Sequence, residues 1–67
     1  MTVYKTVELV GTSEQNWADA VKKGYEKASE TIDGIRNIEI IRSDVKVKED
    51  TGDLIYRVRM NLSFELK

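Results

Sequence analysis

The sequence predicts an α+β fold of order β-α-β-β, in which a three-stranded antiparallel sheet is wrapped around one helix. Two observations support it. Apolar residues recur at steps of three and four in one stretch only, which is the period of an amphipathic helix. The stretches 3–10, 35–48 and 54–66 are rich in β-branched and aromatic residues, as strands are. We expect a single domain over residues 1–67.

The first predicted strand runs from Val3 to Val10, and its polar residues indicate that one face is more exposed to solvent. Gly11 and the two hydroxyl residues after it should end this strand. Thr12 and Gln15 have the three-residue spacing of a capping box, and Ser13 is an alternative helix cap. The helix is therefore expected to begin just behind these residues.

The predicted helix has an apolar and a charged face and extends for about 20 residues, near 30 Å. Asp33-Gly34 should end it, with Gly34 in the left-handed C′ position. Gly24 costs about 1 kcal/mol relative to alanine, so a crossing strand is expected to pack closely on it. Core or interface packing is expected for Trp17 and Tyr25 rather than ligand stacking. The apolar positions are Trp17, Ala20, Val21, Gly24, Ala28 and Ile32.

The second predicted strand, Ile35 to Lys48, changes the parity of its apolar residues near Ile40 and Ile41, which predicts a β-bulge. A polar turn over residues 49–53 follows, with its glycine at positive φ. The third strand, residues 54–66, should span roughly 43 Å and overhang the helix. One face of this strand carries Leu54, Tyr56, Val58, Met60, Leu62, Phe64 and Leu66, and the other carries Arg57, Arg59, Asn61, Ser63 and Glu65.

Composition excludes several classes of function. Eleven basic and twelve acidic residues give a net charge of -1 without a basic block, so nucleic acid is not an expected partner. No stretch reaches the roughly 20 apolar residues of a membrane span. The first residues lack the pattern of a signal peptide, so the expected compartment is the cytoplasm.

The chain contains neither histidine nor cysteine. Disulfides and the usual zinc sites are therefore excluded, and the commonest general base and the thiolate nucleophile are absent. No Ser-x-x-Lys motif or glycine-rich phosphate loop stands out, so we do not expect an enzyme. A chain of 67 residues buries little surface, and oligomerisation is the expected source of additional stability.

Arg57 and Arg59 lie two residues apart on one strand face, as in a site for a phosphate or carboxylate ligand. The alternative is ion pairing between subunits, with Glu65 or Glu39 as partner.

The polar turn offers a second set of charged groups. Its carboxylates, from Glu49, Asp50 and Asp53, lack the spacing of a calcium loop and are interpreted as a solvated turn. A calcium site would more easily be shared between subunits, because assembly brings together carboxylates that one chain holds apart.

Several strings along the chain resemble the dodecin family. They are Val3-Tyr4-Lys5, then Val10-Gly11-Thr12-Ser13, and finally Tyr56-Arg57-Val58 through Ser63-Phe64-Glu65-Leu66. The resemblance covers nearly the whole chain. It implies a three-stranded antiparallel sheet around one helix, and twelve copies that build a hollow homododecamer which binds, stores or buffers a small ligand, flavin or coenzyme A in the family.

Flavin-binding dodecins stack FMN or riboflavin on a tryptophan near the start of strand two, and a glutamine of strand three binds the ring edge. These positions correspond to Asn37 and Arg57 in this sequence. Asn37 offers little stacking area and Arg57 donates but does not accept, so the resemblance implies weak or absent flavin binding.

The chain is more similar to the branch of the family that lacks the tryptophan and is associated with calcium. The resemblance makes Asn37, Arg57 and Arg59 candidate ligand-pocket positions, with an anionic ligand or calcium favoured over flavin. The alternative function is a structural or protein-interaction module without a small-molecule ligand.

Overall fold

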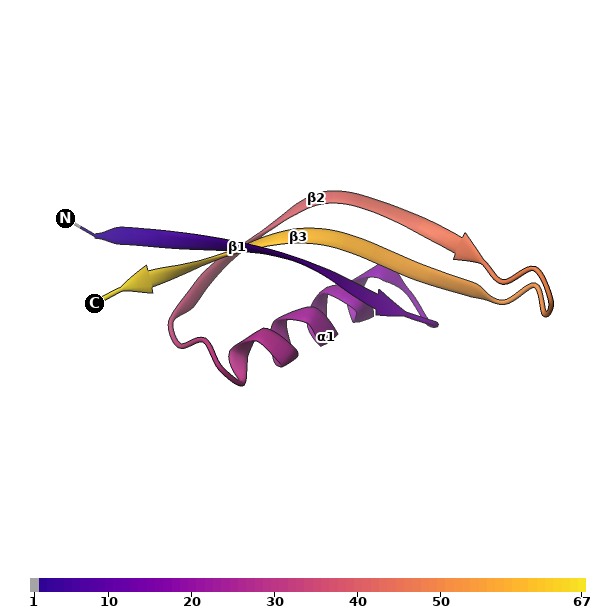
Figure 1. Cartoon of the computed structure of the whole chain (residues 1–67), viewed down its shortest axis with the longest axis horizontal. Helices are drawn as coiled ribbons and strands as arrows, with labels where there is room; N and C mark the ends of the chain where they lie inside the picture. The colour runs from indigo at the N-terminus through magenta and orange to yellow at the C-terminus, as the bar shows by residue number, and fades with distance from the viewer. Residues whose placement is uncertain (1) are drawn as a thin grey trace.

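The computed structural model describes residues 2–67 and arranges them as one sheet and one helix (Figure 1). The elements are β1 (Val3–Ser13), α1 (Trp17–Ser29), β2 (Ile35–Val47) and β3 (Leu54–Leu66). Both strand pairings are antiparallel, and the sheet order β1-β3-β2 puts β3 in the centre. The predicted fold class is confirmed.

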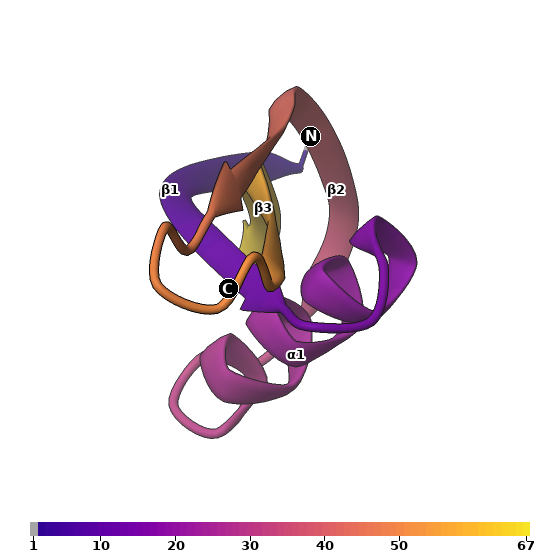
Figure 2. The same cartoon turned by 90° about the vertical axis from the view of Figure 1, so that its right-hand side faces the viewer.

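The helix α1 covers one face of the curved sheet, where it packs against β1 and β3 (Figure 2). The core lies in this layer, and three of its members come from alternate positions of β3, as the sequence pattern predicted. Only a few apolar side chains are fully enclosed, because one helix cannot cover three long strands. The buried apolar residues are Ala20, Ala28, Val58, Met60 and Leu62.

The helix is shorter than predicted, with 13 residues instead of about 20. The predicted caps are wrong, because Gly11–Ser13 continue β1 and pair with β3 as far as Tyr56. The N-cap is Asn16, whose side-chain oxygen accepts a hydrogen bond from the Asp19 backbone N–H at 2.7 Å. The length of β3 explains the difference, since it supplies pairing partners beyond Val10.

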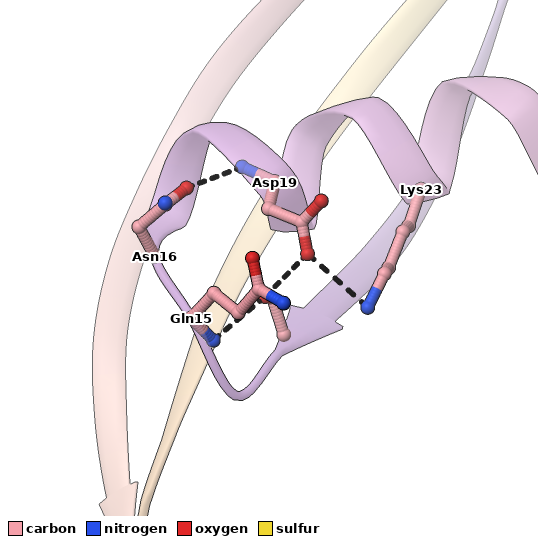
Figure 3. A network of polar contacts seen from close by, with 5 residues as sticks. Gln15, Asn16, Asp19 and Lys23 are labelled. Carbon is pink, nitrogen blue, oxygen red and sulfur yellow. Dashed lines mark hydrogen bonds and ion pairs between the residues drawn. The ribbon is translucent and has the colours of Figure 1, made fainter.

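Ser13 has another role at this junction. Its hydroxyl is buried, accepts a hydrogen bond from the Gln15 backbone N–H at 2.9 Å and donates one to Asp19 at 2.6 Å. Asp19 also forms an ion pair with Lys23, 3.1 Å away (Figure 3). These contacts fix the turn that leads from β1 into α1.

Two glycines have the positive φ that the sequence predicted, at 77° for both Gly34 and Gly52. Gly34, however, is not at the helix C′ position, because the C-cap of α1 is Glu30. Its carbonyl instead accepts a hydrogen bond from the Glu65 backbone N–H at 3.1 Å. Gly34 therefore turns the chain into β2 and joins that strand to the end of β3.

The close packing predicted at Gly24 is confirmed. A Cβ atom at this position would lie 2.9 Å from Met60 Cε and 3.0 Å from Leu9 Cδ1. The side chains that cross the helix here come from β3 and β1. Glycine at this position lets the helix approach the sheet.

The strands extend past α1 at both ends, and the molecule measures 51 × 21 × 14 Å (Figure 1). The helix packs against β1 and β3 rather than β2, so apolar side chains on the helix side of β2 are exposed, including Ile40 at 58% and Val47 at 56%. Trp17 and Tyr25 are 43% and 41% exposed in the single chain, so neither is a core residue, and their packing at an interface between subunits stays a prediction. No helix within residues 2–67 is long and apolar enough to cross a membrane.

Candidate functional site

The face of the sheet opposite α1 is formed mainly by polar side chains, as the alternation of strand three predicted. Strand register places side chains of all three strands on it. The central row comes from β3, with β1 on one side and β2 on the other. The side chains of this face are Ile55, Arg57, Arg59, Asn61, Ser63 and Glu65 of β3, Tyr4, Thr6, Glu8, Val10 and Thr12 of β1, and Asn37, Glu39, Arg42, Asp44 and Lys46 of β2.

A β-bulge in β2 decides which of its side chains join this face. Ile40 pairs with Met60 on the helix side, and the register then shifts between Ile40 and Arg42, as the sequence predicted. After the shift, Arg42 pairs with Arg59 on the outer face. Without the extra residue, period-two alternation would turn Arg42 toward the helix side. A second register shift, between residues 35 and 37, was not predicted.

Five side chains of the outer face enclose an open pocket of about 220 Å³, which we call the arginine pocket. Three of them are arginines, one is an aspartate and one is apolar. They come from all three strands, so the pocket depends on the sheet pairing. Its lining residues are Val10, Arg42, Asp44, Arg57 and Arg59.

Asp44 and Arg57 form a bidentate ion pair across this pocket. Arg57 Nε donates to Asp44 Oδ1 at 2.8 Å, and Nη2 donates to Oδ2 at 2.7 Å. These hydrogen bonds hold the pKa of Asp44 below its ordinary value, and the positive charges of Arg57, Arg42 and Arg59 lower that pKa further. The same contact with Asp44 raises the pKa of Arg57. Asp44 is therefore a stable anion at neutral pH.

The ion-pair partner of Arg57 differs from the two that the sequence suggested. Glu65 instead lies beside Arg36, at 3.6 Å. Pairing of Arg57 or Arg59 with Glu39 or Glu65 of another subunit stays a prediction.

Arg42 and Arg59 are directly opposite each other on neighbouring strands. Neither forms an ion pair with any residue of the range 2–67. Like charges in this arrangement repel each other, because facing side chains start only about 5 Å apart. Asp44 is the single carboxylate that lines the pocket with three guanidinium groups, so the pocket is positively charged and attracts anions.

Asn37 lies away from the arginine pocket. It pairs with Ser63, six residues along β3 from Arg57, which corresponds to about 20 Å. There it lines a separate open pocket of about 400 Å³ with Tyr4, Arg36 and Ser63. The structure thus brings Arg57 and Arg59 together but leaves Asn37 apart, and one small ligand could contact Asn37 and Arg57 only if they came from different subunits.

The structure contains no cluster of three or more carboxylates within residues 2–67 that could hold a metal ion. The polar turn with Glu49 and Asp50 is closed by two backbone hydrogen bonds, Lys48 N to Asp53 O and Gly52 N to Lys48 O.

The sequence interpretation missed Arg42 and Asp44. The signal that could have found them is the same change of parity that predicted the bulge. Counted from the bulge, Arg42 and Asp44 fall on the face of Arg59 and Arg57.

The sequence of this chain is similar to those of known proteins. A family model described as Dodecin matches residues 3–67. The calcium dodecin of Mycobacterium tuberculosis is 31% identical over 67 residues, which is 100% of this chain and 93% of that protein.

Solved structures agree with this result. A crystal structure of the M. tuberculosis protein, described as a calcium-chelating immunodominant antigen with a novel calcium-binding site, has a TM-score of 0.87 at 31% identity, and the match covers 97% of this chain and 91% of that one. An arginine-to-alanine variant of the dodecin of Thermus thermophilus has a TM-score of 0.90 at 31% identity, and the match covers 100% and 98% of the two chains.

Proposed function

The chain belongs to the dodecin family, and we propose that it is the subunit of a hollow homododecamer that binds, stores or buffers a small anionic ligand. The arginine pocket is the observation that carries the proposal, because three guanidinium groups surround one carboxylate in it. Arginine presents a planar fork of N–H donors that matches carboxylate and phosphate oxygens. The ligand would therefore be held by charge and hydrogen bonds.

Assembly is supported by the apolar surface that the helix leaves open. Within residues 2–67, five apolar residues are buried in the isolated chain, which is a small core for a domain without disulfides. Ile40 and Val47 of β2 and Leu54 of β3 lie on the helix side of the sheet and are more than 40% exposed. Contact with further copies of the chain would remove these side chains from water, which stabilises each subunit.

Calcium is the second candidate ligand, and the calcium-binding site of the M. tuberculosis relative favours it. The charge of the arginine pocket opposes a cation there. A calcium ion bound by this protein would instead be held by carboxylates of several subunits, for example around a symmetry axis. Glu49, Asp50 and Asp53 of the polar turn are carboxylates that assembly could bring together in this way.

Flavin binding would be weak or absent. Asn37 offers no ring on which FMN or riboflavin could stack, and Arg57 is already engaged by Asp44. We expect no enzymatic activity. The alternative of a structural or protein-interaction module makes a different prediction, namely a monomer or dimer with one stoichiometric protein partner.

Native mass spectrometry of the purified protein, together with light scattering on a sizing column, tests this proposal. Twelve copies of the 7.7 kDa chain give about 92 kDa. A retained small molecule or metal would appear as added mass on the same species. A stable monomer at micromolar concentration would contradict the assembly. If calorimetry detects binding of calcium but of no anion, the ligand is calcium and the proposal of an anionic ligand is wrong.

A further inference from the structure

We propose that the arginine pocket selects a doubly charged phosphate group, such as that of a phosphate monoester, over a singly charged carboxylate. Arg42 and Arg59 would hold the phosphate between them. This inference rests on the proposed function and names the class of ligand at the same site.

The first step of the argument is the pairing of two like charges. Arg42 of β2 faces Arg59 of β3, and neither has a carboxylate partner within residues 2–67. A ligand that lies between them and carries two negative charges neutralises both guanidinium groups. A phosphate monoester has three terminal oxygens and about two charges at neutral pH, enough for a hydrogen-bonded contact with each arginine. A carboxylate has one negative charge, and its two oxygens match the N–H donors of one guanidinium group only.

The second step is the role of the neighbouring ion pair. Asp44 occupies Nε and Nη2 of Arg57, two of the groups that carry its five N–H donors. This bidentate contact fixes the plane of the guanidinium group, so its remaining donors have a defined direction. Asp44 also places a negative charge on one side of the pocket. The phosphate therefore lies toward Arg42 and Arg59, where no carboxylate lines the pocket.

The surroundings limit the positive region. On β1, the residues opposite Arg59 and Arg57 are Val10 and Thr12, which carry no charge. Val10 is 53% exposed and gives the pocket an apolar wall for the organic part of an ester. The next charged groups along the face are Glu8 and Glu39, both opposite Asn61, and Lys46, opposite Ile55. The attraction is thus confined to the pocket, and salt should weaken it.

The pH dependence of binding should come from the ligand. The chain has no histidine, the side chain that ordinarily titrates between pH 5 and 8. Guanidinium groups stay charged throughout this range, and Asp44 stays ionised because its pKa is lowered. The second ionisation of a phosphate monoester has a pKa of about 6. Affinity for phosphate should therefore rise as the pH is increased from 5 to 7.5, while affinity for a carboxylate should not.

Calorimetry with phenyl phosphate and benzoate as matched probes tests the inference on the purified assembly. At pH 7.5 and low ionic strength, phenyl phosphate should bind at least about tenfold more tightly than benzoate and should lose this advantage at pH 5. Arg42→Gln and Arg59→Gln should each lower the affinity for phenyl phosphate by about tenfold or more. Lys46→Gln, on the same face of β2 but outside the pocket, is the control and should change nothing.

The outcomes separate the inference from the proposed function. If benzoate binds as tightly as phenyl phosphate at both pH values, an anion site remains and the selectivity for phosphate is wrong. If neither probe binds to a 92 kDa particle, the inference and the anionic ligand both fail, and the assembly alone stands. If phenyl phosphate binds equally well to both arginine variants and to Lys46→Gln, the arginine pocket is not the site.

Discussion

The indole Nε1 of Trp17 donates a hydrogen bond to the backbone carbonyl of Asp44, with 3.1 Å between nitrogen and oxygen. Trp17 is the first residue of α1, and Asp44 lies on β2, which is an edge strand of the sheet formed by residues 2–67. The indole also meets the ring of Tyr56 edge-on, with centroids 5.3 Å apart. Trp17 thus connects the start of α1 to Asp44, the residue whose carboxylate forms the ion pair with Arg57.

Replacement of Trp17 should show how much its hydrogen bond to Asp44 contributes to stability. Trp17→Phe keeps an aromatic ring beside Tyr56 but loses the donor to Asp44, so we expect the free energy of unfolding to fall by about 1 kcal/mol. Urea denaturation followed by circular dichroism measures the change. Tyr25→Phe, at a comparably exposed aromatic residue of the same helix, is the control. Equal stability of the two variants would mean that the hydrogen bond to Asp44 contributes little.

The two closely packed glycines should differ in their response to alanine. At Gly11 the new Cβ would collide with the backbone carbonyl oxygen of Ala20, which cannot move without displacing the helix. We expect Gly11→Ala to cost about 3 kcal/mol or more. At Gly24 the nearest atom is the flexible end of Met60, and better helix propensity offsets part of the clash, so Gly24→Ala should cost about 1 kcal/mol.

Thermal and urea unfolding of both glycine variants provide the comparison. Gly24→Ala combined with Met60→Leu should recover stability relative to Gly24→Ala alone, because leucine lacks the terminal methyl group that the new Cβ meets. The packing argument would be wrong if Gly24→Ala were the more damaging of the two single substitutions.

Acid should weaken the junction between β1 and α1. The hydrogen bond from Ser13, then that from Lys23, hold the pKa of Asp19 below its ordinary value of 3.8. The unfolded chain therefore takes up this proton at a higher pH than the folded chain does. The stability that Asp19 contributes is complete above about pH 4 and is lost as the pH falls through the folded-state pKa.

Unfolding midpoints measured from pH 7 to pH 2.5 check this expectation. Asp19→Asn should be less stable than the parent at pH 7, and the gap should narrow on acidification. Glu26→Gln, on the same helix and without an ion pair within residues 2–67, is the matched control. Parallel curves for the parent and Asp19→Asn would show that Asp19 does not contribute to the acid sensitivity.

Substitution of Asp44, the carboxylate of the arginine pocket, should show whether the pocket binds an anion or a cation. Asp44→Asn keeps an acceptor for Arg57 but deletes one negative charge, so phenyl phosphate should bind about three- to tenfold more tightly. Calcium, if it used this carboxylate, would bind more weakly. Calorimetry with both probes decides between the two, and a weaker affinity for phenyl phosphate would count against the proposed charge balance.

The family's flavin clamp can be rebuilt as a test of the sequence alignment. Asn37→Trp combined with Arg57→Gln restores a stacking ring and a side chain that both donates and accepts, so flavin fluorescence should be quenched at micromolar protein. The parent protein and Arg57→Gln alone should not quench. Because Asn37 and Arg57 are about 20 Å apart along the sheet of one chain, quenching should also require the assembled particle.

Sequence patterns predicted much of the fold because they act locally. Alternation along residues 54–66 determined that Val58, Met60 and Leu62 would be buried, since side chains of a strand point to opposite faces in turn. The parity change near Ile40 determined the bulge. The candidate site was predicted in part, since Arg57 and Arg59 do share a pocket.

The remainder depended on contacts between distant parts of the chain. Thr12 and Ser13 have the chemistry of helix caps, yet the long β3 offered them strand partners, and Asn16 became the cap instead. Trp17 has the spacing of a core residue but lies at the sheet edge, because the helix that starts there covers β1 and β3 and leaves β2 open.

The sequence by itself thus determined the order of the elements, their faces and the presence of two outward arginines on β3. Only the tertiary structure decided that Asp44 would pair with Arg57 and that Arg42 would face Arg59 without a carboxylate partner. The physical reason is register. Which residues face each other across two strands depends on the bulge and on the hairpin that joins them, and the charge of the pocket follows from that pairing.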